Sequence, residues 1–246
     1  RTLANEMESG GFLKESSPLY SSRENTSEVV REHSVTTYGG RKFKKEAENA
    51  EDCQACPLWR RATQTVLGAG NPAAEIMIVG EQPGEGEDVS GRPFDGPVER
   101  FLHEALEQAG LELDRVYFTN AVKHFKWKAG QGRRRIRERA TRGERLACRP
   151  WLIAEIAKVR PEVIIALGNC AAQSLTGTEF QALRDRGEVM GTFPGSASIR
   201  VMATVHPSYL LGLRGKEARK MERDRFVEEL NLAGSWCATS VKQGIG

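Results

Sequence analysis

The stretch from Glu75 to Gly84 constrains the fold of this chain more than any other. Its apolar part, residues 76–79, reads Ile-Met-Ile-Val without polar alternation and stops at Gly80. Such a run is typical of a strand buried on both faces, as in a parallel sheet covered by helices. Ligands of open α/β sheets bind beyond the carboxyl ends of the strands. The sequence Gly-Glu-Gln-Pro-Gly that ends this stretch is therefore either a plain turn or part of a functional site.

Three further segments predict strands of the same sheet, and each ends near a polar residue or a glycine. They are residues 116–122 with Asn120, residues 163–168 with Gly168, and residues 200–206 with His206. Parallel strands have their carboxyl ends along one edge of a sheet, so we expect Glu81, Asn120 and His206 to share one crevice. The predicted fold is α/β, with a central four-stranded parallel sheet flanked by helices on both faces.

The length of 246 residues suits one α/β domain with appendages. We expect a polar extension or linker over residues 1–46, a single domain over 47–233 and a tail over 234–246. No apolar run approaches the length of a membrane span, and no signal-peptide core is visible. We therefore expect a monomer in the cytoplasm, associated with the nucleoid.

The helices and loops around the sheet also follow from local patterns. Helices are predicted over residues 98–110, 144–159 and 215–232. Residues 85–97 are rich in glycine and proline and predict a loop. The one large aromatic residue of that loop, Phe94, either stacks on a flat base or plugs the core. Asn120 offers both a donor and an acceptor, which suits the reading of a base edge as well as the capping of a turn.

Positive charge is unevenly distributed, although the formal net charge is only +3. Between residues 126 and 149 the basic residues outnumber the acidic Glu138 and Glu144. The basic residues are Lys126, Lys128, Arg133, Arg134, Arg135, Arg137, Arg139, Arg142, Arg145 and Arg149. A surplus of this size favours a polyanion as partner. Residues 130–142 form either a solvated loop or, given their position after Asn120, a contact with the DNA backbone.

The five cysteines are scattered apart from one close pair, Cys53 and Cys56. An odd, scattered set suits a reducing compartment better than a secreted disulfide framework. Two thiolates three residues apart can bind one metal centre, and this spacing is shared by zinc and iron–sulfur sites. The alternative is a pair of structural thiols. Cys170 lies among small apolar residues and is interpreted as a core residue.

Four motifs resemble, in order and spacing, those of the family-4 uracil-DNA glycosylases that carry an iron–sulfur cluster. The motifs are Gly80–Gly84, Gly91–Phe94, Thr119–His124 and His206–Ser208. The Lys-His-Phe sequence and the long arginine-rich insertion resemble the UdgX branch of that family. The similarity extends over roughly residues 50–232, which is nearly the whole predicted domain.

This resemblance implies an enzyme that flips a uracil nucleotide out of DNA, single- or double-stranded, and hydrolyses its N-glycosidic bond. The implied catalytic residues are Glu81 and His206. The implied contacts to the substrate base come from Gly80, Gln82, Pro83, Gly84, Phe94 and Asn120. The implied contacts to the DNA come from Arg134, Arg135, Arg137 and Ser208.

The resemblance also implies a [4Fe-4S] cluster with a structural role next to the DNA. Its implied ligands are Cys53, Cys56, His124 and Cys148. The wider family has a cysteine at the position of His124, whereas the UdgX branch is similar to this chain in having a histidine. The residue types alone fit zinc equally well, and histidine ligation of a cluster has a precedent in Rieske centres.

One residue departs from the UdgX pattern. Proteins of that branch have a histidine after Arg-Arg-Ile that attacks the sugar and leaves the protein covalently bound to the abasic site. Here Arg137 follows Ile136, and a guanidinium is always protonated and cannot be that nucleophile. We expect excision without covalent trapping. The alternatives are a non-catalytic protein that binds uracil or abasic DNA, and a zinc-stabilised domain that binds nucleotides.

Overall fold

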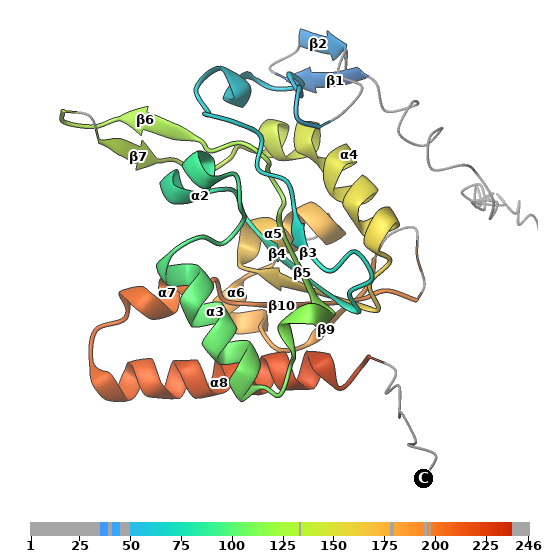
Figure 1. Cartoon of the computed structure of the whole chain (residues 1–246), viewed down its shortest axis with the longest axis vertical. Coiled ribbons are helices and arrows are strands. Elements are labelled where there is room, and N and C mark those ends of the chain that lie inside the picture. Colours follow the sequence, from blue (N-terminus) through green and yellow to red (C-terminus); the bar gives the residue numbers. More distant parts are fainter. Residues whose placement is uncertain are drawn as a thin grey trace, which may run out of the picture.

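The computed structural model describes residues 35–38, 41–44, 50–132, 134–177, 180–193, 196 and 198–237. Its centre is a six-stranded sheet with the order β3-β5-β4-β8-β10-β9 (Figure 1). The four inner strands are parallel and comprise β5 (Val116–Asn120), β4 (Ile76–Gly80), β8 (Val163–Leu167) and β10 (Arg200–Thr204). The predicted α/β fold with a parallel central sheet is thereby confirmed.

Two antiparallel edge strands extend this sheet beyond the four that the sequence predicts. They are β3 (Ala69–Gly70), which pairs with β5, and β9 (Val189–Thr192), which pairs with β10. The edge strands are exposed or half-buried, whereas all five residues of β4 and of β8 are buried. Only the inner strands therefore have the continuous apolar runs that predict burial on both faces.

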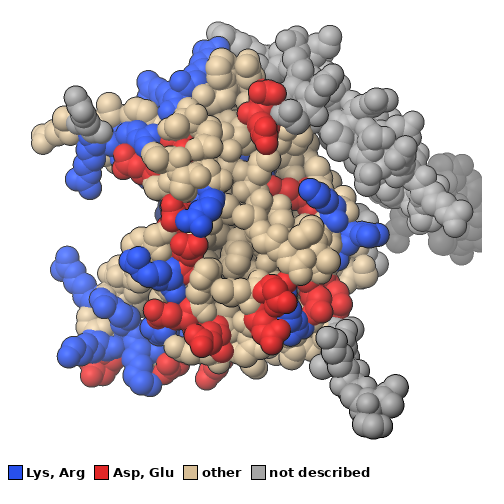
Figure 2. Space-filling view, viewed as in Figure 1, with Lys and Arg blue, Asp and Glu red and all other residues tan. Residues whose placement is uncertain are grey.

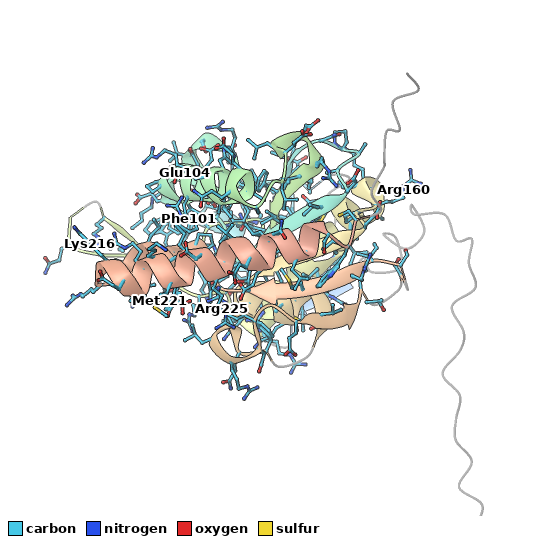
Figure 3. All side chains as sticks on the ribbon, turned by 90° about the horizontal axis from the view of Figure 1, so that it is seen from below. Phe101, Glu104, Arg160, Lys216, Met221 and Arg225 are labelled. Atoms are coloured by element: carbon cyan, nitrogen blue, oxygen red, sulfur yellow. The ribbon has the colours of Figure 1, made fainter. Side chains whose placement is uncertain are left out.

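Alternate residues of each inner strand pack into two separate apolar cores. Ile76 and Ile78 face a core formed with α3 (Pro97–Gln108), α7 (Pro207–Gly212) and α8 (Lys216–Gly234). Met77 and Val79 face a second core formed with α4 (Arg142–Val159) and α5 (Asn169–Thr176). Figure 3 shows α8 running lengthwise beneath the sheet, with Phe101 of α3 beside it. The ring centroids of Phe101 and Phe226 are 5.7 Å apart.

The prediction of a loop over residues 85–97 is wrong for its first half, which forms the helix α2 (Glu85–Ser90). Gly84 is the N-cap of this helix, and the Glu87 carboxylate accepts a hydrogen bond of 2.9 Å from the Gly84 N–H. Three acidic residues in the first turn also interact favourably with the helix dipole. These local interactions compensate for the low helix propensity of Gly86.

The segments outside the predicted domain contain some ordered structure. A two-stranded sheet of β1 (Val35–Tyr38) and β2 (Arg41–Lys44) falls within the predicted extension, and β1 lies beside α4. Residues 1–34 are outside the described part of the chain. At the other end, Trp236 and Cys237 of the predicted tail pack against the core under α8. Among the helices of the described ranges, none could cross a membrane.

The remaining elements are short. They are η1 (Pro57–Arg60), η2 (Leu113–Arg115), α6 (Ala182–Asp185) and the strands β6 (Trp127–Ala129) and β7 (Arg135–Arg137). The last two pair antiparallel and form hairpin β6–β7, which contains most of the arginine-rich segment. A hairpin, rather than an irregular loop, therefore presents these arginines beside the carboxyl edge of the sheet (Figure 1).

Candidate active site

A cavity of about 500 Å³ opens beyond the carboxyl ends of the inner strands. Parallel pairing aligns Gly80 with Asn120 and Leu167 with Thr204, so the residues that follow each strand meet at one edge. We call this space the strand-end cavity. Its lining includes Glu81, Arg137, Arg145, Cys170, His206 and Ser208. Glu81 and His206, which are far apart in the sequence, thus face the same space.

The Glu81 carboxylate is paired with the arginine that departs from the UdgX pattern. Arg137 Nη2 lies 3.6 Å from Glu81 Oε2 and donates a hydrogen bond of 3.3 Å to the carbonyl oxygen of Gln82. Both side chains remain partly accessible, with 19% of the Glu81 and 37% of the Arg137 side-chain surface exposed. A permanent cation from β7 therefore reaches the carboxylate at the end of β4.

His206 is the N-cap of α7, and its environment fixes the tautomer of its ring. The backbone N–H of Ser208 donates to His206 Nδ1 over 3.2 Å. A neutral imidazole that accepts at Nδ1 has its proton on Nε2. Burial, together with the positive charge of Arg137, lowers the pKa of His206 to about 3. The ring is neutral at pH 7 and can donate a hydrogen bond from Nε2.

Phe94, Asn120 and Gly80 form a tightly packed group next to this ring. The Phe94 and His206 rings are nearly parallel, with an interplanar angle of 24° and centroids 6.4 Å apart. Phe94 has a φ of 57°, which is uncommon for a bulky residue. A Cβ atom on Gly80 would lie 2.3 Å from Asn120 Oδ1 and 2.8 Å from Phe94 Cζ. The close approach of these side chains to the strand therefore requires glycine at position 80.

Glu87 holds this group together, and the sequence analysis did not identify it. Its Oε1 accepts a hydrogen bond of 3.0 Å from the Phe94 N–H, and its Oε2 accepts from Gly84 N–H and, at 3.5 Å, from Asn120 Nδ2. Burial raises the pKa of Glu87, while these hydrogen bonds oppose the rise. The Glu87 bond to the Gly84 N–H is one half of a capping box, but glycine lacks the Ser or Thr side chain that marks this motif in a sequence.

Lys123 fixes the end of β5 from within the protein. Its side chain is fully buried, and its Nζ donates to the Asn120 carbonyl oxygen over 2.7 Å and to Thr119 Oγ1 and Glu155 Oε2 over 2.6 Å each. Glu155 of α4 also accepts from Thr119 Oγ1 and from the Gly68 N–H. A buried lysine is stable only when it is paired in this way.

The side chain of Gln82 points away from the strand-end cavity. It is 3% exposed, and its Nε2 donates to the carbonyl oxygens of Glu138 at 2.8 Å and Lys126 at 3.4 Å. Gln82 Oε1 has no hydrogen-bond partner within the described residues. Gln82 thus tethers the base of hairpin β6–β7, and only its backbone can face a bound base. Pro83 is buried, and Gly84 lies at the start of α2.

The predicted DNA-contact arginines lie in different environments. Arg135 is bound within the protein: it donates to Asp88 over 2.7 Å and to Glu85 over 3.0 Å, and its guanidinium lies over the Phe125 and Trp127 rings. This side chain fastens the hairpin to α2. Arg134 is exposed, and the exposed Ser208 lines the strand-end cavity. Figure 2 shows Lys and Arg side chains on both sides of a hollow, over the hairpin and around the start of α8.

The four predicted cluster ligands are all buried. Cys53, Cys56 and Cys148 share one apolar cluster and are free thiols. Trp151 Nε1 donates to Cys53 Sγ over 3.0 Å, and the Lys123 N–H donates to Cys148 Sγ over 3.4 Å. Burial raises the pKa of Cys56 to about 11 and also raises that of Cys148, with contributions from the neighbouring thiols. The thiols are therefore close enough to influence one another.

His124 fits a ligand role by its chemistry. Its Nε2 is 3.0 Å from Thr65 Oγ1, whereas its buried Nδ1 lacks a hydrogen-bond partner in the described part of the chain. Burial lowers the pKa of His124 to about 4, so the ring is in the neutral form that metals bind. Within the described ranges, however, no three His, Cys, Asp or Glu side chains are arranged around a point that a single metal ion could occupy. The cofactor therefore stays a prediction.

The sequence as a whole identifies the class of protein to which this site belongs. Residues 67–231 match the model of the uracil DNA glycosylase superfamily. The chain belongs to that superfamily, and the glycosylase class predicted from the sequence is confirmed.

Within the superfamily the chain is similar to Type-4 uracil-DNA glycosylases. It is 36% identical over 191 residues to the one from Thermotoga maritima, a match that covers 77% of this chain and 92% of that protein. It is 35% identical over 170 residues to the one from Saccharolobus solfataricus, covering 67% of this chain and 75% of that protein. It is 32% identical over 189 residues to the one from Archaeoglobus fulgidus, covering 75% of this chain and 88% of that protein.

Proposed function

We propose that this chain excises uracil from DNA by hydrolysing the N-glycosidic bond of a flipped deoxyuridine. The observation that carries the proposal is that Glu81 and His206 line one cavity, with Phe94 in near-parallel contact with the His206 ring. A duplex hides the glycosidic bond, so the nucleotide must leave the base stack before it reaches this cavity. The similarity to Type-4 uracil-DNA glycosylases supports uracil as the base.

The base is held by Phe94 and Asn120 in this proposal. Phe94 stacks on the uracil ring, and the Asn120 amide pairs with O4 and N3 of uracil. Cytosine presents the opposite donor and acceptor pattern at these two positions, so the same amide orientation rejects it. The Glu87 carboxylate accepts from Asn120 Nδ2 and thereby favours the amide orientation that places Nδ2 towards O4.

The leaving group is stabilised by His206 and by the backbone near Gln82. Bond cleavage leaves negative charge on uracil O2, and the neutral His206 ring donates a hydrogen bond to that oxygen from Nε2. The hydrogen bond from the Ser208 N–H to Nδ1 holds the ring in the required tautomer. Backbone N–H groups around Gln82 add donors of the oxyanion-hole type.

Glu81 acts on the other fragment of the broken bond. The sugar develops positive charge, which the Glu81 carboxylate stabilises electrostatically while it positions the attacking water. Arg137 pairs with this carboxylate in the free protein. When DNA binds, a flanking phosphate competes for Arg137 and leaves the carboxylate facing the sugar.

We further propose membership of the UdgX branch, without the covalent product of that branch. Arg137 cannot be the nucleophile, so water completes the reaction and the abasic DNA dissociates. The test is an excision assay on a single-uracil oligonucleotide followed by denaturing electrophoresis. Release of uracil with free abasic DNA is the expected result, and a protein–DNA band that survives denaturation would contradict it.

A second candidate is a protein that binds uracil or abasic DNA without cleaving the bond. The Glu81–Arg137 pair favours this candidate, because a carboxylate neutralised in this way cannot stabilise the sugar cation. The same assay separates the two. Tight binding of the uracil oligonucleotide without release of uracil would identify the binder.

The implied [4Fe-4S] cluster would be held by Cys53, Cys56, His124 and Cys148. When bound it acts as a structural crosslink between the segment before η1, the loop after β5 and helix α4. The four ligands of such a cluster bind separate iron atoms and need not converge on one point, whereas zinc requires four donors around one ion. His124 Nδ1, which has no hydrogen-bond partner among the described residues, supports a ligand at this position. We propose that the protein acts as a monomer on DNA in the cytoplasm.

A further inference from the structure

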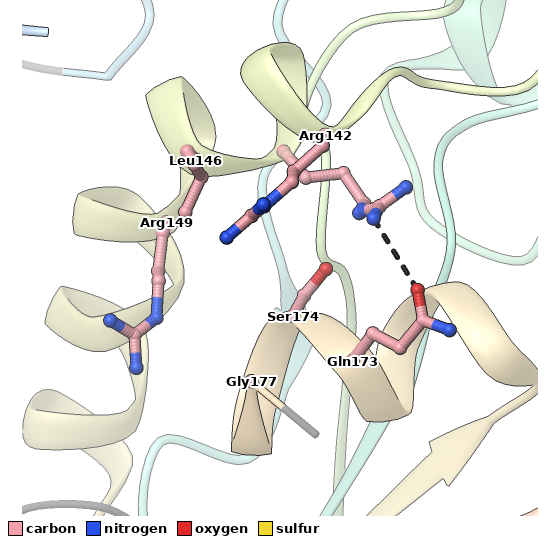
Figure 4. Close-up of a pocket in the computed structure, with 7 residues that line it drawn as sticks. Arg142, Leu146, Arg149, Gln173, Ser174 and Gly177 are labelled. Carbon is pink, nitrogen blue, oxygen red and sulfur yellow. Dashed lines mark hydrogen bonds between the residues drawn. The ribbon is translucent and has the colours of Figure 1, made fainter. Parts of the chain in front are cut away.

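A second basic cavity, of about 400 Å³, lies between α4 and α5 (Figure 4). We call it the α4–α5 groove. Its α4 wall consists of Arg142, Arg145, Leu146 and Arg149, and its α5 wall includes Gln173 and Ser174. The α4 residues recur at helical spacing and form one stripe, in which Arg142 and Leu146 are exposed and Arg145 and Arg149 are half-buried. The buried residues of α4 include Cys148, Trp151 and Leu152.

The three arginines of this groove are not neutralised by carboxylates. Arg145 donates to the carbonyl oxygen of Ala140 over 3.1 Å and to Gln173 Oε1 over 3.4 Å. The side chains of Arg142 and Arg149 have neither a hydrogen bond nor an ion pair with any described residue. Arg135, by contrast, is bound by two carboxylates. The N-terminus of α4, capped by Thr141, adds further positive potential. A bound anion would relieve the mutual repulsion of these guanidinium groups.

The groove adjoins the strand-end cavity. Arg145 and Gln173 line both spaces and form the boundary between them. A polymer that enters the strand-end cavity can therefore extend along α4. The eight residues from Arg142 to Arg149 span about 10 Å of helix. Two neighbouring phosphates of one strand can therefore contact this stripe at the same time.

We propose that the α4–α5 groove binds the phosphate backbone of the strand that carries the uracil, a few nucleotides from the flipped position. Guanidinium groups bind phosphates through paired hydrogen bonds. The groove lining contains no aromatic side chain among the described residues, so it contacts the backbone and does not stack on bases. Binding here is independent of sequence. The inference extends the proposed function, because it assumes that the strand-end cavity receives DNA.

The test compares two double variants that remove the same charge from the same helix. The groove variant is Arg142→Gln with Arg149→Gln, which leaves Arg145 and the strand-end cavity intact. The control is Lys158→Gln with Arg160→Gln, at the exposed far end of α4. Circular dichroism and thermal melting establish that both variants fold like the wild type. Binding of a uracil-free oligonucleotide of about 20 nucleotides, long enough to fill the groove, is then measured by fluorescence anisotropy at several salt concentrations.

The groove variant is expected to bind this oligonucleotide on the order of tenfold more weakly than the control variant. The slope of log K against log salt should fall by about 1.4, since two phosphate contacts of about 0.7 each are lost. In an excision assay with an oligonucleotide of the same length that carries one uracil, KM should rise while kcat stays unchanged, and a uracil substrate too short to reach the groove should show no difference.

Equal affinities and equal salt slopes in the two double variants would overturn the proposal and would favour a different anion, such as an acidic peptide, in the groove. The binding measurement needs no uracil and no catalysis. A wild-type protein that fails to excise uracil but shows the difference between the variants would therefore refute the proposed activity and leave the groove assignment standing.

Discussion

Arg137 Nη2 lies 3.6 Å from the Glu81 carboxylate, so hairpin β6–β7 places a fixed cation beside the acidic side chain that follows β4. Replacement of this arginine by histidine would restore a neutral nucleophile at that place. We predict that Arg137→His gains a covalent protein–DNA band on denaturing electrophoresis after incubation with a uracil oligonucleotide. Arg137→Gln is the control, since it removes the charge without supplying a nucleophile. The absence of a band with Arg137→His would place the loop outside reach of the sugar.

Glu81 and His206 stabilise opposite charges in the proposed transition state, so the loss of either side chain should slow the excision of uracil. We predict that Glu81→Gln and His206→Gln each slow excision by about 10²–10³-fold, the usual effect of removing one charge-stabilising group. Single-turnover kinetics with a uracil oligonucleotide measure the effect, and thermal melting checks the fold. A rate within threefold or so of the wild type in both variants would refute these roles.

Position 80 requires glycine because Asn120 and Phe94, which hold the base in the proposed function, pack closely against it. A Cβ atom at this position would lie 2.3 Å from Asn120 Oδ1, so Gly80→Ala should displace the amide and Phe94. We predict a raised KM and weaker discrimination between uracil and cytosine. Gly86→Ala is the control: a Cβ there meets no heavy atom within 4 Å, and alanine favours the helix by about 0.5–1 kcal/mol. If the Gly80→Ala variant has the same KM and the same discrimination between uracil and cytosine as the Gly86→Ala variant, Asn120 does not read the base from this position.

The sequence patterns predicted the inner sheet because burial on both faces leaves a continuous apolar run, as in Ile76–Val79. The edge strand β3 has two residues, which is too short to give any period, and β9 lies at the exposed edge of the sheet. The start of α2 was missed because the glycines around Glu85 predict a loop and the N-cap Gly84 lacks the side chain that usually marks a helix start. Local patterns therefore determine the core of this fold better than its periphery.

The sequence predicted that Glu81 and His206 lie at one edge of the sheet, but it did not predict the directions of the side chains around them. Parallel strands bring Glu81 and His206 to one edge, and this follows from topology alone. The Gln82 side chain points towards the hairpin because its Nε2 donates hydrogen bonds to the carbonyl oxygens of residues 126 and 138. The pairing of Arg135 likewise depends on Asp88 of α2. Contacts between segments so distant in the chain cannot be predicted from a local sequence pattern.

His206 should influence the dependence of stability on pH. Its pKa is lowered from 6.5 to about 3 in the folded protein, mainly by burial. Between these values the unfolded chain binds a proton that the folded protein does not, so the free energy of unfolding falls as the pH decreases from about 6.5 towards 3. We predict that His206→Gln loses less stability than the wild type between pH 7 and pH 5 in urea unfolding. An identical loss in both proteins would contradict the lowered pKa.

The cofactor prediction can be tested at the one ligand that differs from the wider family. The buried Nδ1 of His124 has no hydrogen-bond partner in the part of the chain that the structure describes. A cysteine at this position would supply a thiolate ligand of the usual kind. We predict that the purified protein is brown and contains iron and inorganic sulfide, that His124→Ala loses both and is less stable, and that His124→Cys retains them. Thr65→Val serves as a control, since it removes the hydrogen bond to Nε2 and leaves Nδ1 in place. A colourless wild-type protein that contains zinc, or iron content unchanged in His124→Ala, would remove His124 from the ligand set.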